Sequence, residues 1–167
     1  MLQGGNGMRV YVAGPLFSAA ERAFNVEVAG RIERVGFEVF LPQRDGAEAD
    51  RPPYDRMSRE QRRAAMFTLD RDEVLGCDVF LFVTDERVPD EGAAVELGIA
   101  YTHRHLTGAE RLIVGLRTDT RTAFANAALN PMISQALDHL CHSIEELAAT
   151  LAAHLPSTPD HARPSSS

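Results

Sequence analysis

The fold of this chain is decided by Asp78-Val-Phe-Leu-Phe-Val83 and by Asp90-Glu-Gly-Ala-Ala-Val-Glu-Leu-Gly-Ile-Ala100, which follows it closely. The first stretch is a short continuous apolar run, typical of a strand buried in a parallel sheet. The second reads as a helix, with Glu96 in its first two turns among Ala, Val, Leu and Ile. A carboxylate in such surroundings is costly unless it is paired or used. Asp90 lies where the strand's carboxyl end meets the helix, the edge at which open α/β sheets bind ligands.

Outward from this pair, short apolar runs alternate with helical segments in both directions. We expect strands at residues 9–13, 37–41, 112–116 and 139–141, and helices at 18–35, 57–75, 91–105, from 131 and from 143. Glutamates follow Ser18 and Ser143 at the spacing of a capping box, and Gly36 follows the end of the first helix. Residues 43–55 and 117–130 are polar and read as loops.

This alternation predicts a single α/β domain with a doubly wound, five-stranded parallel sheet and helices on both faces. Right-handed crossovers then place every strand-to-helix loop on one rim. Tyr11 lies in the first strand, three residues before that rim begins at Gly14. We expect residues 1–7 to be a flexible lead, 8–155 the folded domain and 156–167 a disordered tail, because the tail is rich in Pro and Ser.

Composition excludes several classes of function. The chain has 167 residues and a formal net charge of −7, which argues against a nucleic-acid binder but does not exclude an uncharged nucleoside. No apolar run approaches the ~20 residues that a membrane span needs. The two cysteines, Cys77 and Cys141, are too few for a disulfide framework, and no signal peptide is evident. We therefore expect buried free thiols and a cytoplasmic protein without membrane contact.

Four residues are candidates for chemistry, namely Tyr11, Asp70, Asp90 and Glu96. A glutamate can attack an electrophilic carbon, a tyrosine can orient it, and an aspartate of raised pKa can protonate a leaving group. That division of labour between carboxylates is the logic of retaining glycoside cleavage.

Each candidate also has a purely structural interpretation, and spacing alone does not choose between the two. Glu96 fits a solvated residue on the helix surface, paired with Arg104 or another base, and Asp90 fits a plain N-cap. Asp70 fits one of several surface charges in residues 69–73, and Tyr11 fits a residue that packs in the core from its strand.

Cofactor and metal signals are weak. Gly14 follows a strand, but the spaced glycines of a dinucleotide fingerprint do not, and no phosphate loop is present. His103 and His105 would point about 200° apart on a helix, which is poor for chelation. Residues 139–142 fit a strand and its turn better than a metal site. We therefore expect neither a cofactor nor a metal.

Taken in order, four segments resemble the nucleoside 2-deoxyribosyltransferase family: residues 10–17, 41–46, 90–98 and 130–133. The resemblance spans roughly residues 8–151 and implies a flavodoxin-like or Rossmann-like sheet. It also implies exchange of the base of 2'-deoxynucleosides in two half-reactions, a step of nucleoside salvage acting on purines or on both kinds of base.

By position, the resemblance implies that Glu96 is the nucleophile and forms a deoxyribosyl ester. It implies that Tyr11 holds the Glu96 carboxylate and that Asp70 is the acid beside the departing base. The remaining positions implied to bind substrate are Asp90 and Asn130 on the sugar's 5'-hydroxyl, with Met132, Gly14, Phe17 and Gln43. Of these, Phe17 would stack on the base or pack in the core, and Gln43 would read base edges. In this family the segment with Asn130 and Met132 often comes from a neighbouring subunit, which implies a homo-oligomer, a dimer or a higher even assembly, with shared sites.

Two departures from the family pattern concern the sugar pocket. Ala93 stands where many relatives have Thr, and Pro131 follows Asn130 where Leu is common.

Two rival functions fit the same residues. The first is an N-glycoside hydrolase of nucleosides or of deoxynucleoside 5'-monophosphates, although an anionic Asp90 would repel a phosphate at close range. The second is a non-catalytic nucleoside-binding module, in which Glu96 would only accept hydrogen bonds.

Overall fold

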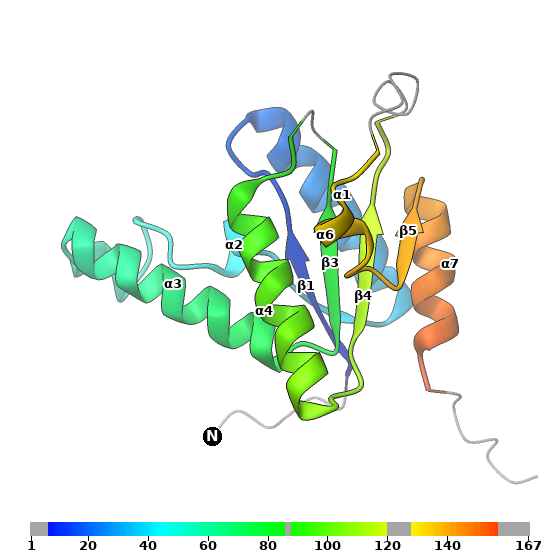
Figure 1. Ribbon diagram of the computed structural model, residues 1–167. Helices are drawn as coiled ribbons and strands as arrows, with labels where there is room; N and C mark the ends of the chain where they lie inside the picture. The colour runs from blue at the N-terminus through cyan, green and yellow to red at the C-terminus, as the bar shows by residue number, and fades with distance from the viewer. Residues whose placement is uncertain (1–6, 86–87, 120–127, 157–167) are drawn as a thin grey trace, which may run out of the picture.

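The computed structural model describes residues 7–85, 88–119 and 128–156, and these form a parallel sheet covered by helices (Figure 1). The sheet has the order β2-β1-β3-β4-β5 and every neighbouring pair is parallel. Its strands are β1 (Arg9–Ala13), β2 (Glu38–Phe40), β3 (Val79–Val83), β4 (Leu112–Leu116) and β5 (His139–Cys141). This order is that of flavodoxin-like doubly wound folds, so the predicted fold class is confirmed.

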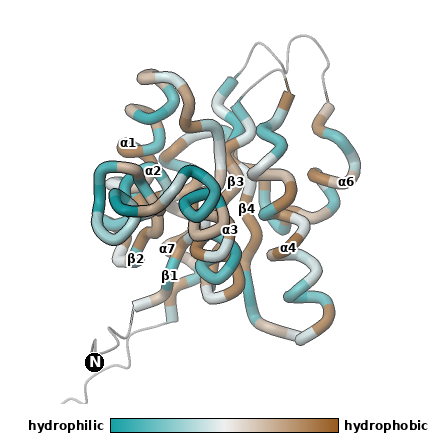
Figure 2. The backbone as a smooth tube through the Cα atoms, turned by 90° about the vertical axis from the view of Figure 1, so that its left-hand side faces the viewer, coloured by the Kyte–Doolittle hydropathy of each residue, from teal (hydrophilic) through white to brown (hydrophobic). Residues whose placement is uncertain are grey.

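Helices cover both faces of the sheet, as the edge-on view shows (Figure 2). They are α1 (Ala19–Val35), α2 (Pro42–Asp45), α3 (Arg59–Gly76), α4 (Glu91–Thr107), α6 (Pro131–Ser134) and α7 (Ile144–His154), with a 3-10 turn η1 (Tyr54–Arg56). The Ser18 capping box is complete, and Gly36 ends α1 with a φ of 116°, in the left-handed region. No helix in these ranges is long and apolar enough to cross a bilayer.

Alternate residues of each strand serve different layers, because side chains along a strand point to opposite faces. Val10 and Val12 belong to a core cluster that includes buried residues of α1 and α7. Tyr11 and Ala13 belong to the opposite cluster, which includes buried residues of α3 and α4. The Tyr11 side chain lies in the core, as its place in the strand predicted, and it points to the side of the sheet covered by α3 and α4, the helices that carry Asp70 and Glu96.

The segment predicted to be a loop at residues 43–55 contains structure that the sequence interpretation missed. A proline at the first position of α2 fixes a helical φ, and the Asp45 carboxylate accepts a hydrogen bond from the Leu41 amide at 2.9 Å. Tyr54–Arg56 forms the 3-10 turn. Helix α3 begins at Arg59 rather than residue 57, because Ser58 with Gln61 makes a capping box there.

The chain reverses direction across the sheet between β1 and β3. From β1 it crosses through α1 to β2 on one side, and then through α3 to β3 on the other. Ligands of open α/β sheets bind at such a switch point. A Cβ on Gly14 would lie 2.8 Å from the Cβ of Val83, so glycine lets the end of β1 approach the end of β3.

Candidate active site

Tyr11 is placed by the register of the sheet. It pairs with Phe40 on β2 and with Phe80 on β3. Its ring stacks between these two phenylalanines, with ring centroids 5.5 and 5.8 Å away. The phenol is fully buried, and its hydroxyl donates a hydrogen bond of 2.9 Å to Oε1 of Glu96. The two packed aromatic neighbours therefore fix the donor that holds the Glu96 carboxylate.

Glu96 reaches Tyr11 because α4 packs on the sheet through Ala93, Leu97 and Ala100. Glu96 lies three residues after Ala93 and next to Leu97, on the same side of the helix. Burial raises the pKa of Glu96 to about 7, and the charges of Asp70 and Asp90 act in the same direction, whereas the Tyr11 hydrogen bond opposes them. Arg104, one of the bases that the structural interpretation offered as a partner of Glu96, forms an ion pair with Asp138 instead.

The hydroxyl of Tyr11 keeps its proton. Burial first, and then the nearby Glu96 and Asp70 charges, raise the pKa of Tyr11 well above its ordinary value. The phenol is therefore a permanent donor, which stabilises the ionised form of Glu96 without itself titrating.

Asp70 lies on α3, close enough for its charge to raise the pKa of Glu96. Burial raises the pKa of Asp70 to about 6, and the charges of Glu48 and Glu73 add to that effect. Its Oδ1 atom is buried and has no hydrogen-bond partner among the described residues. A carboxyl group of raised pKa with an unused oxygen in a site is a candidate proton donor.

Asp90 is the N-cap of α4, as the structural interpretation held. Its Oδ1 atom accepts a hydrogen bond from the Ala93 amide at 2.8 Å. The charge of Asp90 nevertheless acts on Glu96, six residues further along the chain. The cap therefore places a second carboxylate beside the candidate nucleophile.

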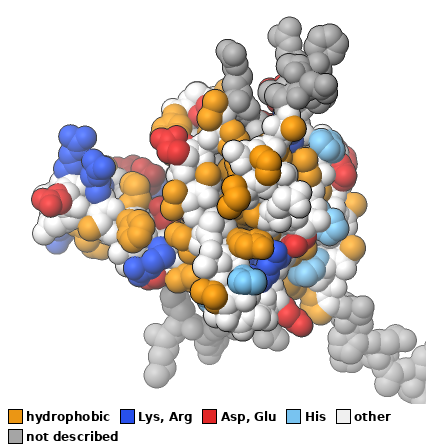
Figure 3. Space-filling view, in the orientation of Figure 1, with side chains coloured by type: hydrophobic (Ala, Val, Ile, Leu, Met, Phe, Trp, Pro, Cys, Tyr) orange, Lys and Arg blue, Asp and Glu red, His pale blue; other side chains and the backbone are white. Residues whose placement is uncertain are grey.

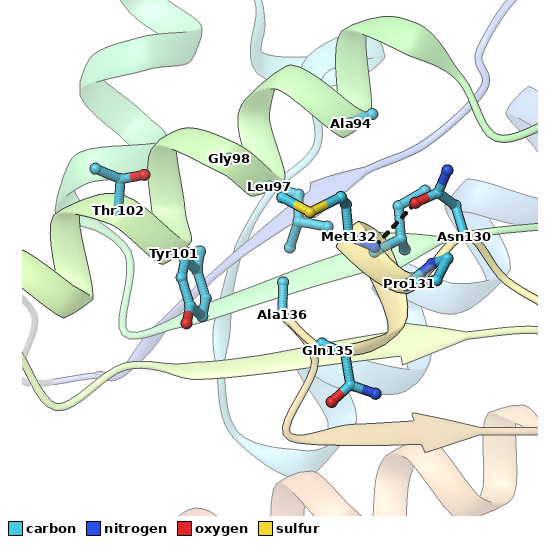
Figure 4. Close-up of a pocket in the computed structure, with 11 residues that line it drawn as sticks. Ala94, Leu97, Gly98, Tyr101, Thr102, Asn130, Pro131, Met132, Gln135 and Ala136 are labelled. Atoms are coloured by element: carbon cyan, nitrogen blue, oxygen red, sulfur yellow. Dashed lines mark hydrogen bonds between the residues drawn. The ribbon is translucent and has the colours of Figure 1, made fainter.

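Asn130 caps α6 and Met132 lies within it, and α6 lies against α4. Asn130 caps α6 by accepting the Met132 amide at 2.9 Å, and the Met132 side chain is 83% exposed. Both residues line an apolar groove with Gly98 and Tyr101 of α4 (Figure 4). Glu96 is not among the residues that line this groove.

The remaining predicted positions lie at the carboxyl rim of the sheet. Phe17 is 74% exposed, so it does not pack in the core. Gln43 lines a polar cavity with Arg22 and Glu48, among others. Its amide bonds within the chain, donating to the Arg22 carbonyl at 2.8 Å and accepting from Asn25 at 3.1 Å.

Two residues of this region were missed by sequence reasoning. Glu48 acts electrostatically on Asp70, and nothing in the local sequence distinguishes it from other loop acids. Asn25 had a usable signal, because it is the one polar member of a buried stripe at helical spacing with Val28, Ala29 and Ile32. In the described ranges, no group of three or more His, Cys, Asp or Glu residues is arranged to hold a metal ion.

These features define a class: an α/β protein with a tyrosine-bound, half-buried glutamate and a second carboxyl group of raised pKa at the switch point of its sheet. Comparison with known proteins identifies the family. The family Nucleoside 2-deoxyribosyltransferase matches residues 10–156, and the chain belongs to this family. No curated protein sequence matches the chain.

Solved structures share the fold at low sequence identity. A conserved protein from Enterococcus faecalis V583 is 24% identical with a TM-score of 0.67, covering 89% of this chain and 99% of its own. A 2-deoxyribosyltransferase from Bacillus psychrosaccharolyticus is 20% identical with a TM-score of 0.67, covering 86% and 95%. A CMP N-glycosidase from Clostridium botulinum is 19% identical with a TM-score of 0.52, covering 88% and 99%.

Proposed function

We propose that the protein transfers the 2'-deoxyribosyl group between nucleobases by double displacement through an ester on Glu96. The observation that carries the proposal is the partly buried hydrogen bond of 2.9 Å between the Tyr11 hydroxyl and the Glu96 carboxylate. Family membership supports an enzyme acting on the glycosidic bond of nucleosides.

In the first half-reaction an oxygen of ionised Glu96 bonds to C1' while the C1'–N bond breaks. The bonding pair leaves with the base nitrogen, and Asp70 supplies its proton. In the second half-reaction the nitrogen of an incoming base attacks C1', the ester bond breaks, and the electron pair returns to Glu96 while Asp70 takes up a proton. A carboxylate below the sugar stabilises the oxocarbenium character that develops between these states.

Both carboxyl groups have pKa values raised toward neutral pH, although the value for Glu96 is the higher of the two, so the protonation state that the first step needs is held by a minority of molecules. Glu96 must be ionised and Asp70 protonated for the first step. With pKa values raised to about 7 and about 6, each group is partly in either form close to neutral pH. No cofactor is required by these steps. Asp90 and Asn130 would bind the 5'-hydroxyl, and the anionic Asp90 disfavours a 5'-phosphate.

A homo-oligomer with shared sites accounts for the exposed groove between α4 and α6. The groove is apolar, and its lining includes Asn130 and the exposed Met132 but not Glu96. Hydrophobic side chains gather over the face that carries α4 and α6 (Figure 3). Docking of a second copy there would cover this surface and bring the second copy's Asn130 toward the site. The two buried free cysteines fit a reducing, cytoplasmic setting.

Product analysis tests the proposal. The protein is incubated with deoxyinosine and adenine, with deoxyinosine alone, and in both cases beside Glu96→Gln as the control. We expect deoxyadenosine in the first mixture and little free sugar in the second. Hypoxanthine and free deoxyribose in both mixtures would instead identify a hydrolase, in which water attacks the ester. Binding of nucleosides without any turnover would contradict an enzyme and favour a binding module.

A further inference from the structure

A short chain of hydrogen bonds connects the β1–α1 loop to Gln43 through a buried asparagine. Asn25 on α1 is only 3% exposed. Its Nδ2 atom donates to the Pro15 carbonyl at 2.9 Å and to Oε1 of Gln43 at 3.1 Å. The Nε2 atom of Gln43 in turn donates to the Arg22 carbonyl at 2.8 Å. The amides of Asn25 and Gln43 are thus held between two backbone carbonyls.

These carbonyls fix which way both amides face. A carbonyl oxygen only accepts hydrogen bonds, so the nitrogen of Asn25 must face Pro15. The atom of Gln43 that faces this nitrogen must then be its oxygen, which leaves the Gln43 nitrogen to face Arg22. Turning either amide over would set an amide oxygen against a carbonyl oxygen at one end of this series of hydrogen bonds.

Asn25 is not the residue that stability alone would select here. Its Oδ1 atom is buried without a hydrogen-bond partner among the described residues, which destabilises the folded state. The neighbouring buried positions of the same helix stripe are Val28, Ala29 and Ile32. An apolar residue at position 25 would avoid the unpaired acceptor, so the amide has to be explained by what it bonds.

Gln43 has hydrogen-bonding capacity left for a ligand. Each of its amide atoms uses one of two possible bonds within the chain, leaving one N–H and one lone pair. Gln43 lines the polar cavity that also includes Arg22 and Glu48. Glu48 lies near enough to Asp70 for its charge to act on that carboxyl group, which places the cavity beside the candidate proton donor.

We propose that Asn25 is a specificity-determining residue: it fixes the Gln43 amide so that the site distinguishes bases with an amino group from bases with a carbonyl at the same position. This rests on the proposed function, since the ligand is the base that the enzyme exchanges. An amide of fixed orientation offers its oxygen to an exocyclic amino group and repels a carbonyl there, or the reverse at its nitrogen. An amide free to turn over accepts both.

The test compares the affinities of adenine and hypoxanthine, which carry an amino and a carbonyl group at C6. Their Kd values are measured by calorimetry on the full chain of wild type, Asn25→Leu and Asn25→Asp, with folding checked by circular dichroism. Val28→Ala is the matched control, because it loosens the same buried helix stripe without touching the amides. We expect wild type and Val28→Ala to prefer one base by about tenfold or more.

In Asn25→Leu only the exposed bond to the Arg22 carbonyl still orients the Gln43 amide, so the preference should fall severalfold toward one. Asn25→Asp keeps the side-chain volume but can only accept, so neither orientation of the Gln43 amide satisfies both the new carboxylate and the Arg22 carbonyl, and the preference should likewise fall. A wild-type preference near one, no measurable binding of either base, or an unchanged preference in a folded Asn25 variant would each overturn the proposal. Base exchange by wild type is assayed in parallel: its absence contradicts the proposed function, whereas exchange with an unchanged preference contradicts only the role of Asn25.

Discussion

The two faces of α4 depart from ordinary side-chain placement in opposite ways. Toward β1 and α3 the helix buries the Glu96 carboxylate against the Tyr11 phenol. Toward α6 it leaves an apolar surface open, where Tyr101 is 38% and Met132 83% exposed. Stability alone favours the reverse arrangement on both faces. One helix thus carries a carboxylate inside the protein on one face and exposed apolar side chains beside the other. We interpret the first as a catalytic site and the second as an interface.

The largest expected effect comes from removing the carboxylate of the buried face. Glu96→Gln should lower base exchange by more than about 10³-fold, because no other group can form the ester. The protein should stay folded, and Glu91→Gln, at an exposed position of the same helix, is the control for exchange. Exchange near the wild-type rate would contradict the role of Glu96.

The same variant carries a stability signature. The folded-state pKa of Glu96 is about 7, above its ordinary value of 4.5, so its contribution to stability falls as pH rises through that window. Glu96→Gln should therefore raise Tm relative to wild type at pH 8, and the difference should vanish near pH 4. Thermal unfolding followed at both pH values measures this.

Loss of the proton donor should have the next largest effect. Asp70→Asn should lower kcat by about 10²- to 10⁴-fold, since the departing base would leave without its proton. In wild type, the rate should fall at high pH because Asp70 loses the proton that it must donate. The residual activity of Asp70→Asn should not show this fall in its pH–rate profile. A pH–rate profile of the variant that keeps the loss of activity at alkaline pH would rule out this role.

A smaller loss is expected on removing the hydroxyl that orients Glu96. Tyr11→Phe keeps the stacked ring but deletes a hydrogen bond to a charged group, which should lower kcat/KM by about 10- to 100-fold. The bond lowers the pKa of Glu96, so the acidic limb of the profile should shift to higher pH in the variant. A rate loss without that shift would indicate only disturbed packing.

The open face of α4 is tested by mixing two inactive variants. Glu96→Gln and Asn130→Leu, after subunit exchange, should recover about a quarter of wild-type activity, because half of the dimers are mixed and each holds one intact site. A mixture of Glu96→Gln with Asp70→Asn is the control, since both changes affect the same face and no intact site can form. If the first mixture is no more active than the second, the sites are not shared.

The alternation of strands and helices was predictable from the sequence, because buried strands are continuously apolar and capping residues mark helix starts. The short helix α2 was missed, since a four-residue turn after Pro42 has no periodicity to detect. The sequence suggested Tyr11, Asp70 and Glu96 as candidates, but their positions relative to one another depend on sheet register and on how α3 and α4 pack, which a local pattern does not contain. The unpaired acceptor of Asn25 and the electrostatic reach of Glu48 likewise exist only in three dimensions.

The central claim is that Glu96 becomes bonded to the sugar. The direct measurement is mass spectrometry of the protein after brief incubation with a 2'-deoxynucleoside in the absence of acceptor base, followed by a rapid quench. The account predicts a gain of one deoxyribosyl group, located on the peptide that contains Glu96 and lost when a free base is added before the quench. Release of base and free deoxyribose with no such adduct at any time, or an adduct on another residue, would contradict it.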